Sequence, residues 1–230
     1  MRYSKLWLML AVVLVVSFTV LGFFGWEIYQ QVPPIFKQAV TPNGVVLFTK
    51  KDIQDGQNIW QSMGGQQVGS IWGHGSYVAP DWTADWIHRE AESYLNAWSK
   101  SQYGVNHYRQ LQPEQLAALE ARLKQLMRTN TYNAKTGTLT LSSLRADTIQ
   151  TVGRHYDALF GNNSAPDIIK LRNAYAIPPD KVPNPANRQK LNAFLFWASW
   201  AASTNRPGGH VTYTQNWPPA YHPTRLFEVG

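Results

Sequence analysis

The chain has no cysteine among its 230 residues. This absence excludes a disulfide framework and thiolate metal sites. It also excludes a haem held by thioether bonds, because that attachment needs two thiols and a histidine in a C-x-x-C-H motif. The absence of cysteine does not identify the redox compartment, since large exported domains can fold without disulfides.

The chain also lacks clustered charge. Only 15% of its residues are charged, and the formal net charge of +7 is scattered, with Lys50-Lys51 as the longest run of basic residues. Electrostatic binding to nucleic acid needs a clustered basic stripe, so no nucleic-acid partner is expected. The 44% hydrophobic content excludes a wholly disordered protein. The length suits one ordinary domain with some additional sequence.

One long hydrophobic run lies near the N-terminus. The 21 residues from Leu6 to Trp26 carry no charge, and a helix of about 20 residues crosses the hydrocarbon core of a bilayer. Arg2 and Lys5 precede the run and Glu27 follows it, so the positive-inside rule places the N-terminus in the cytoplasm and the rest of the chain outside. The alternative is a cleavable signal peptide, which usually has a shorter apolar core and a small-residue cleavage site. We expect a retained anchor and an extracytoplasmic domain.

The remainder is predicted to be mainly α-helical with long irregular connections. Apolar side chains at helical spacing predict helices over 51–62, from after Asp81 with Thr83 as the expected N-cap, from Pro113, and over about 142–160, where Gly161 stops the helix. Each begins or ends at a residue typical of a helix boundary.

The connecting segments are polar or rich in proline. Residues 129–140 predict a linker or a small hairpin, and 177–185 predict a loop because proline removes backbone donors. Asn184 is expected to cap a helix over 185–203 that is apolar nearly all round. Its apolar run of about twelve residues is too short for a membrane span and predicts a buried helix.

Few residues suggest chemistry by their spacing alone. None of the six histidines forms an H-x3-H or HExxH pair. His74 is the candidate worth testing, because its glycine neighbours let a ligand approach closely. Asp81 and Asp85 are candidates for an acid pair, although a first-turn charge on a helix explains Asp85 equally well.

Two further features are interpreted as structural. We expect a solvent-exposed helix face to carry His88, Glu90 and Glu92. The ten tryptophans fall mostly on apolar helix faces or beside proline and glycine, which favours core packing or docking to a partner.

Three tryptophan-rich stretches carry a family resemblance. They read GQNIWQSMGGQQVGSIWGHGSYVAPDWTADW at 56–86, FLFWASWAASTNRPG at 194–208 and VTYTQNWPP at 211–219. In these stretches the chain resembles the N-terminal part of a quinol-dependent nitric oxide reductase of the single-chain bacterial type. The resemblance extends to about Pro219.

The resemblance implies a haem-less cytochrome c-like domain. In this family one transmembrane helix and a hydrophilic domain precede the catalytic helix bundle, and electrons come from quinol in the membrane. Counting back from Gly75-Ser76-Tyr77, the positions of C-x-x-C-H fall on Gly65 to Gly69, where neither thiol nor imidazole remains. The stretch from Trp60 to Trp86 thus keeps the pattern of a haem-binding segment without its ligands.

The resemblance also implies that this chain lacks the catalytic centre. Reduction of two NO to N2O and water takes place in the family at haem b3 and a non-haem iron beside a second haem b, and their histidine ligands lie on later membrane helices. The chain departs from the family after Pro219, so we expect a truncated or split reductase. The expected division is an anchor over 1–30, the cytochrome c-like domain over 31–219 and a divergent tail over 220–230.

One metal site is implied by the resemblance. A calcium ion at the interface with the bundle takes ligands in this family from a segment similar to Gly73-His74-Gly75-Ser76-Tyr77, and we carry this over to Gly75 and Tyr77 only. Hard calcium prefers oxygen ligands, and the remaining ligands would come from the bundle and the haems. The alternative is a glycine-rich turn with Tyr77 packed in the core.

Two functional interpretations remain open. The first is a non-catalytic part of a denitrifying nitric oxide reductase in the bacterial inner membrane, in contact with lipid and capping the bundle on the periplasmic side. The second is a free-standing, membrane-anchored periplasmic module for binding or sensing. The first predicts that the isolated domain has an adhesive surface bearing Trp72, Tyr77, Trp197 and Trp217.

Overall fold

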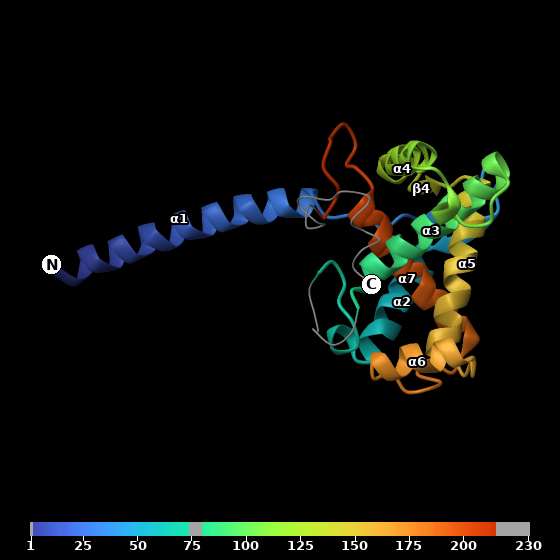
Figure 1. The fold of residues 1–230 in the computed structure, drawn as a ribbon. Coiled ribbons are helices and arrows are strands. Elements are labelled where there is room, and N and C mark those ends of the chain that lie inside the picture. Colours follow the sequence, from blue (N-terminus) through green and yellow to red (C-terminus); the bar gives the residue numbers. More distant parts are fainter. Residues whose placement is uncertain (1, 74–79, 215–230) are drawn as a thin grey trace. The chain divides into compact units, whose positions relative to one another are not determined.

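The computed structural model describes residues 2–73 and 80–214, in two compact units, Met1–Pro34 and Ile35–Gly230. The first unit consists mainly of α1 (Arg2–Gln30), drawn in blue in Figure 1. Within the described part of the chain, α1 is the one helix long and apolar enough to cross a membrane. Its large apolar side chains are exposed along its length. These features agree with the predicted anchor.

The second unit is mainly helical with a small sheet. Its α-helices are α2 (Lys50–Ser62), α3 (Trp82–Tyr103), α4 (Pro113–Arg128), α5 (Ser143–Phe160), α6 (Pro166–Ala174) and α7 (Pro185–Ser203). Two short 3-10 helices are η1 (Gly65–Gln67) and η2 (Tyr108–Gln110). The strands are β1 (Gln38–Val40), β2 (Val46–Thr49), β3 (Tyr132–Asn133) and β4 (Thr138–Thr140).

Helix α7 forms the centre of this unit. All side chains from Leu191 to Ala202 are buried, and α2, α3 and α5 pack against the helix from different sides (Figure 1). Asn184 caps its N-terminus by accepting a hydrogen bond from the backbone N–H of Ala186. The predicted buried helix over 185–203 is confirmed, and its apolar character on all sides follows from this central position.

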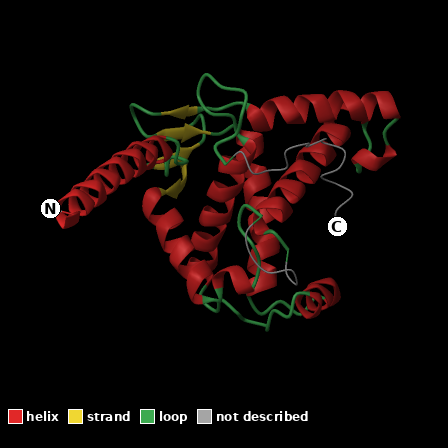
Figure 2. Cartoon of the chain, turned by 90° about the vertical axis from the view of Figure 1, so that its left-hand side faces the viewer, coloured by secondary structure: helices red, strands yellow, loops and turns green. Residues whose placement is uncertain are grey.

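The strands form one four-stranded sheet in the order β2-β1-β4-β3, shown in yellow in Figure 2. β1 is antiparallel to β2 and parallel to β4, and β3 pairs with β4 as an antiparallel hairpin. The hairpin confirms the prediction for 129–140. β1 and β2 were not predicted, because strands of three and four residues are too short for a clear alternation of apolar and polar side chains.

α3 begins directly after Asp81, as predicted, but its N-cap differs from the prediction. The N-cap is Asp81, whose carboxylate accepts from the N–H of Ala84, and the predicted N-cap Thr83 lies inside the first turn. The hydroxyl of Thr83 instead accepts from the backbone N–H of Trp72 at 3.1 Å. Because this contact with a distant loop engages the Thr83 hydroxyl, Asp81 caps the helix instead.

The other predicted helix boundaries agree closely with the structure. α4 begins at Pro113, α5 follows a Ser142 N-cap and ends at Gly161, and α2 begins one residue early, at Lys50. α6 was missed because Arg172 is its one buried side chain. The Arg172 guanidinium donates to backbone carbonyls of 158–163, and apolar periodicity does not reveal such polar anchoring.

The tryptophans mostly pack in the core, as expected. Trp82, Trp86 and Trp200 are almost wholly buried. Trp86 stacks on Tyr156 with ring centroids 5.3 Å apart and planes inclined by 3°. Trp82 meets Phe160 edge to face at 5.4 Å. These aromatic contacts hold α3 against α5.

Candidate functional site

The segment at the expected haem position packs tightly against α3. Gly65 to Gln67 form η1, and Gly69 has φ of +148°. A Cβ at Gly69 would lie 1.9 Å from Nε1 of Trp82. No side chain fits at Gly69, the position at which the resemblance predicts the counterpart of a haem-ligating histidine.

The loop that follows is closed by a carboxylate at its base. Asp81 accepts hydrogen bonds from the Ser70 hydroxyl at 2.7 Å and from the backbone N–H of Gly73 at 2.6 Å. Ser70 and Asp81 also form an isolated parallel bridge. Asp81 therefore joins the two described ends of the loop and caps α3 with the same side chain.

Trp72 ties this loop base to α7. Its indole Nε1 donates to the Ala198 carbonyl at 2.8 Å, and its ring lies 5.5 Å from that of Trp197. Trp72 has φ of 57°, an uncommon conformation for a large residue, held here by contacts on both sides.

The predicted calcium ligands Gly75 and Tyr77 lie outside the described residues, as does His74. The expected adhesive surface is corrected in part: Trp197 is only 7% exposed and belongs to the core. Trp72 is half-buried, and Tyr77 and Trp217 lie outside the described residues. Among the described residues, no group of three or more His, Cys, Asp or Glu side chains is placed to hold a metal ion.

Replacing Asp81 with alanine is expected to lower the free energy of unfolding by about 1–3 kcal/mol, because the buried Ser70 hydroxyl and the Gly73 N–H lose their acceptor and α3 loses its cap. Asp81→Asn keeps one acceptor oxygen for the cap, so it should lose less stability than alanine. Urea unfolding measures the stability, and amide exchange at Gly73 reports on the loop base. Asp147→Ala, an exposed aspartate of α5, is the control. Equal stability of Asp81→Ala and this control would contradict the assigned role.

The two candidate acidic residues do not act as a pair. Asp81 bonds within the loop base, whereas Asp85 accepts from Arg89 Nε at 2.8 Å and from the Tyr156 hydroxyl at 2.7 Å. Separate partners hold the two carboxylates, and Asp85 links α3 to α5. Its role is structural.

Glu90 contradicts the expected exposed helix face. Its side chain is fully buried and accepts from Arg145 Nε at 2.7 Å and from Trp86 Nε1 at 3.2 Å. His88 and Glu92 remain partly exposed. No local pattern in the sequence predicts the contact between Glu90 and Arg145, because Arg145 lies 55 positions away on α5.

His155 is a partly buried imidazole on α5. Burial, and next the nearby Arg89, lower its pKa to about 4, while Asp85 opposes the shift. The folded protein therefore keeps His155 neutral at pH values where an unfolded chain, with a pKa of about 6.5, takes up a proton.

A pH dependence of stability follows from this difference. The His155 contribution is constant above about pH 6.5, falls by about 3 kcal/mol as the pH drops from there to about 4, and is constant below. The difference in unfolding free energy between the wild type and His155→Gln, measured by urea titration at each pH, isolates this contribution from other groups. A pH-independent difference would contradict the lowered pKa.

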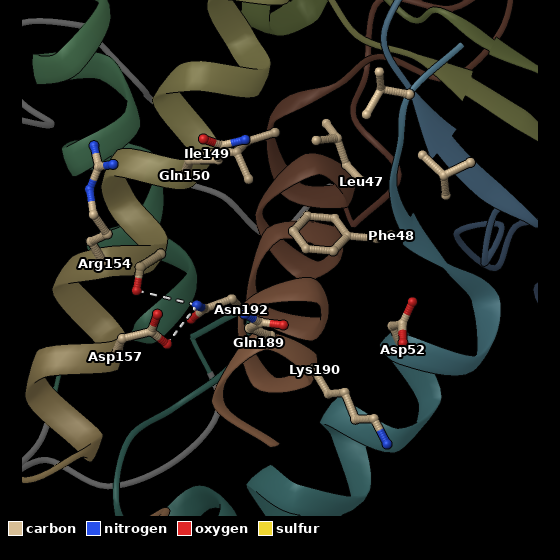
Figure 3. Close-up of a pocket in the computed structure, with 13 residues that line it drawn as sticks. Leu47, Phe48, Asp52, Ile149, Gln150, Arg154, Asp157, Gln189, Lys190 and Asn192 are labelled. Atoms are coloured by element: carbon tan, nitrogen blue, oxygen red, sulfur yellow. Dashed lines mark hydrogen bonds between the residues drawn. The ribbon is translucent and has the colours of Figure 1, made fainter. Parts of the chain in front are cut away.

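An amphipathic cavity of about 540 Å³ lies between β2, α2, α5 and α7 (Figure 3). Leu47 and Phe48 line one side, and Arg154 and Asp157 lie across from them. The Asn192 amide donates to the Asp157 carboxylate and to the Gly153 carbonyl, each at 3.2 Å. Burial raises the pKa of Asp157, opposed by the Asn192 hydrogen bond. These contacts join α5 to α7 and provide a hydrogen-bonded wall.

The architecture defines a class. A membrane-length apolar helix precedes a mainly helical cytochrome c-like domain, and the absence of cysteine and the close packing at Gly69 leave no means for thioether haem attachment. Residues 36–219 match the family described as the cytochrome c-like domain of the nitric oxide reductase NorB, and the chain belongs to that family. No curated protein matches the sequence.

Proposed function

We propose that this chain is a non-catalytic N-terminal part of a quinol-dependent nitric oxide reductase. In this role α1 anchors it in the bacterial inner membrane, and the domain over 31–219 caps the catalytic bundle on the periplasmic side. The family match over residues 36–219 carries the proposal. Gly69 supports it, because a domain without a haem ligand there suits an enzyme that takes electrons from quinol within the membrane.

The proposal includes a shared calcium site. Gly75 and Tyr77 would supply a carbonyl and a phenol oxygen, and the bundle with its haem b groups would supply the rest, because calcium takes six to eight oxygen ligands. The absence of a metal-binding cluster among the described residues is compatible with a site completed by a partner. The Asp81 contacts fix the ends of the segment that holds both residues.

Co-purification tests the association. The full chain, tagged and purified in mild detergent from membranes of its host, should bring with it the absorption spectrum of haem b, although it has no thiol for haem attachment. Residues 1–34 fused to an unrelated soluble domain provide the matched control for the anchor. A monomeric chain without haem b would overturn the proposal and favour the free-standing module.

The cysteine-free sequence allows a direct test of topology. A membrane-impermeant maleimide applied to intact spheroplasts should label Lys124→Cys, on the exposed side of α4, and should leave Ser4→Cys unlabelled until the membrane is permeabilised. The wild type is an unreactive control, because it has no thiol. Labelling of Ser4→Cys in intact spheroplasts would contradict the proposed orientation.

A further inference from the structure

The turn that joins β1 to β2 contains the pair Asn43-Gly44. Asn43 is the one asparagine of the chain that is followed by glycine. Residues Pro42 to Val45 are exposed, and the Asn43 side chain forms no hydrogen bond with the part of the chain that the structure describes. The side-chain amide of Asn43 is therefore accessible to water and to the neighbouring backbone.

The geometry of the turn accounts for the glycine. The Gly44 N–H donates to the Thr41 carbonyl at 2.9 Å, and the Thr41 N–H donates to the Val45 carbonyl at 2.9 Å. Gly44 has φ of +79°, and a three-residue hairpin loop typically places a left-handed glycine after a type I turn. Glycine is thus needed for the conformation, and its missing Cβ leaves the Gly44 nitrogen unshielded.

The Gly44 nitrogen can close a five-membered ring with the side-chain carbonyl carbon of Asn43. Any other residue after Asn43 would place a Cβ beside this nitrogen and obstruct the approach. The hydrogen bond from Gly44 to Thr41 must open before the ring closes, and hydrogen bonds in exposed turns open at a low free-energy cost. The exposed turn therefore permits a reaction that a rigid, buried backbone would prevent.

We propose that Asn43 is a site of spontaneous deamidation in the folded protein. The Gly44 nitrogen bonds to the side-chain carbonyl carbon of Asn43, the bond from this carbon to the amide nitrogen breaks, and that nitrogen leaves as ammonia with the proton of Gly44. Water then opens the succinimide ring at either carbonyl, which gives aspartate or isoaspartate. The reaction requires only this chain and water, so it is independent of the association with a catalytic bundle.

Both products change the tip of the hairpin. Each adds one negative charge, and isoaspartate also adds one carbon to the backbone of the turn. The longer backbone no longer fits the hydrogen bond between Thr41 and Val45, so the pairing of β1 with β2 weakens at this end. Val45 also lines the cavity beside β2, and the new charge therefore arises next to that cavity.

The pair Asp55-Gly56 provides a contrast within the same chain. Aspartate followed by glycine can close the same ring with loss of water. Here both residues lie in α2, Gly56 is buried, and the Asp55 carboxylate accepts from Lys51 and Lys190. Because the helix and these contacts hold the carboxylate away from the backbone nitrogen, Asp55 should stay unmodified while Asn43 reacts.

Peptide mapping by mass spectrometry tests the proposal on the full chain, incubated in detergent at mildly alkaline pH in water enriched in heavy oxygen. Asn163 is the reference, because it is exposed, precedes Ser164 and accepts from the Ala165 N–H at 2.8 Å. Asn43 should deamidate at least about 10-fold faster than Asn163, as a modestly lower barrier gives, and the product should carry one heavy oxygen. If Asn43 reacts no faster than Asn163, the proposal is wrong.

Two variants test the route through the Gly44 nitrogen. Gly44→Asn adds a Cβ that meets no heavy atom within 4 Å, and asparagine tolerates the left-handed conformation. This variant should slow the loss of Asn43 at least about 10-fold. Asn43→Gln would need a six-membered ring and should stay unmodified. Equal loss of Asn43 in the wild type and Gly44→Asn would overturn the route, and loss of Asn43 only in urea would show that the folded turn protects it and overturn the proposal.

Discussion

Replacing Glu90 with alanine is expected to lower the free energy of unfolding by about 3–5 kcal/mol, because it leaves the Arg145 guanidinium buried without its counter-charge. The Glu90 side chain is fully buried and that of Arg145 is 7% exposed, so water cannot replace the lost carboxylate. Trp86 Nε1 loses its acceptor at the same time. Urea unfolding followed by tryptophan fluorescence measures the loss.

Two further variants identify the cause of the stability loss in Glu90→Ala. Glu92→Ala removes a carboxylate two residues further along α3 that is 31% exposed and pairs with Arg109, so a loss of at most about 1 kcal/mol is expected. Glu90→Met combined with Arg145→Leu removes both charges and keeps the volume, and it should recover most of the stability. If the double variant were as unstable as Glu90→Ala, the loss of stability would come from lost packing and not from the unpaired charge of Arg145.

Features that depend on neighbouring residues were predictable from the sequence. Asn184 followed by Pro185 marks a helix start, and the apolar run after it indicates burial on all sides, as α7 shows. Gly161 marks the end of α5, and Pro113 the start of α4. Glycine, proline and capping residues act through the backbone within a few positions, so the sequence displays their effects directly.

Features that depend on distant residues were not predictable in this way. Glu90 occupies a helix position typical of a solvated carboxylate, and its burial depends on Arg145. Thr83 is a good N-cap by type, but the N–H of Trp72 occupies its hydroxyl. The Arg172 contacts that hold α6 leave no apolar pattern. In each case a polar tertiary contact outweighs the local propensity.

The candidate site contains both features that were predictable from the sequence and features that were not. The resemblance predicts the counterpart of a haem site at Gly65 to Gly69, and the structure adds a physical reason why Gly69 accepts no histidine. Asp81, which closes the loop base, was predicted only as a member of an acid pair. Its partners Ser70 and Gly73 lie 11 and 8 positions away, beyond the range in which spacing predicts contacts. Gly75 and Tyr77 remain predictions.

Replacing Gly56 with alanine is the second large effect that we expect. Gly56 is buried on α2, where a Cβ would lie 2.0 Å from the Lys190 carbonyl oxygen and 2.8 Å from Cβ of Phe194. Alanine favours a helix over glycine by about 1 kcal/mol, but a clash with the backbone of α7 cannot be relieved by a side-chain rotation. We expect a net loss of about 3 kcal/mol in unfolding free energy.

Gln54→Ala, at an exposed position of the same helix, tests the propensity alone and should be neutral or slightly stabilising. An equally stable Gly56→Ala protein would show that α2 and α7 are not in close contact. The substitution should also affect the loop base, because α2 leads into residues 63–73 and α7 supplies the Ala198 carbonyl that holds Trp72. Amide exchange at Gly73 should therefore accelerate in the folded Gly56→Ala protein and stay unchanged in Gln54→Ala. The close crossing of α2 and α7 thus positions the loop on which the proposed contact with the catalytic bundle depends.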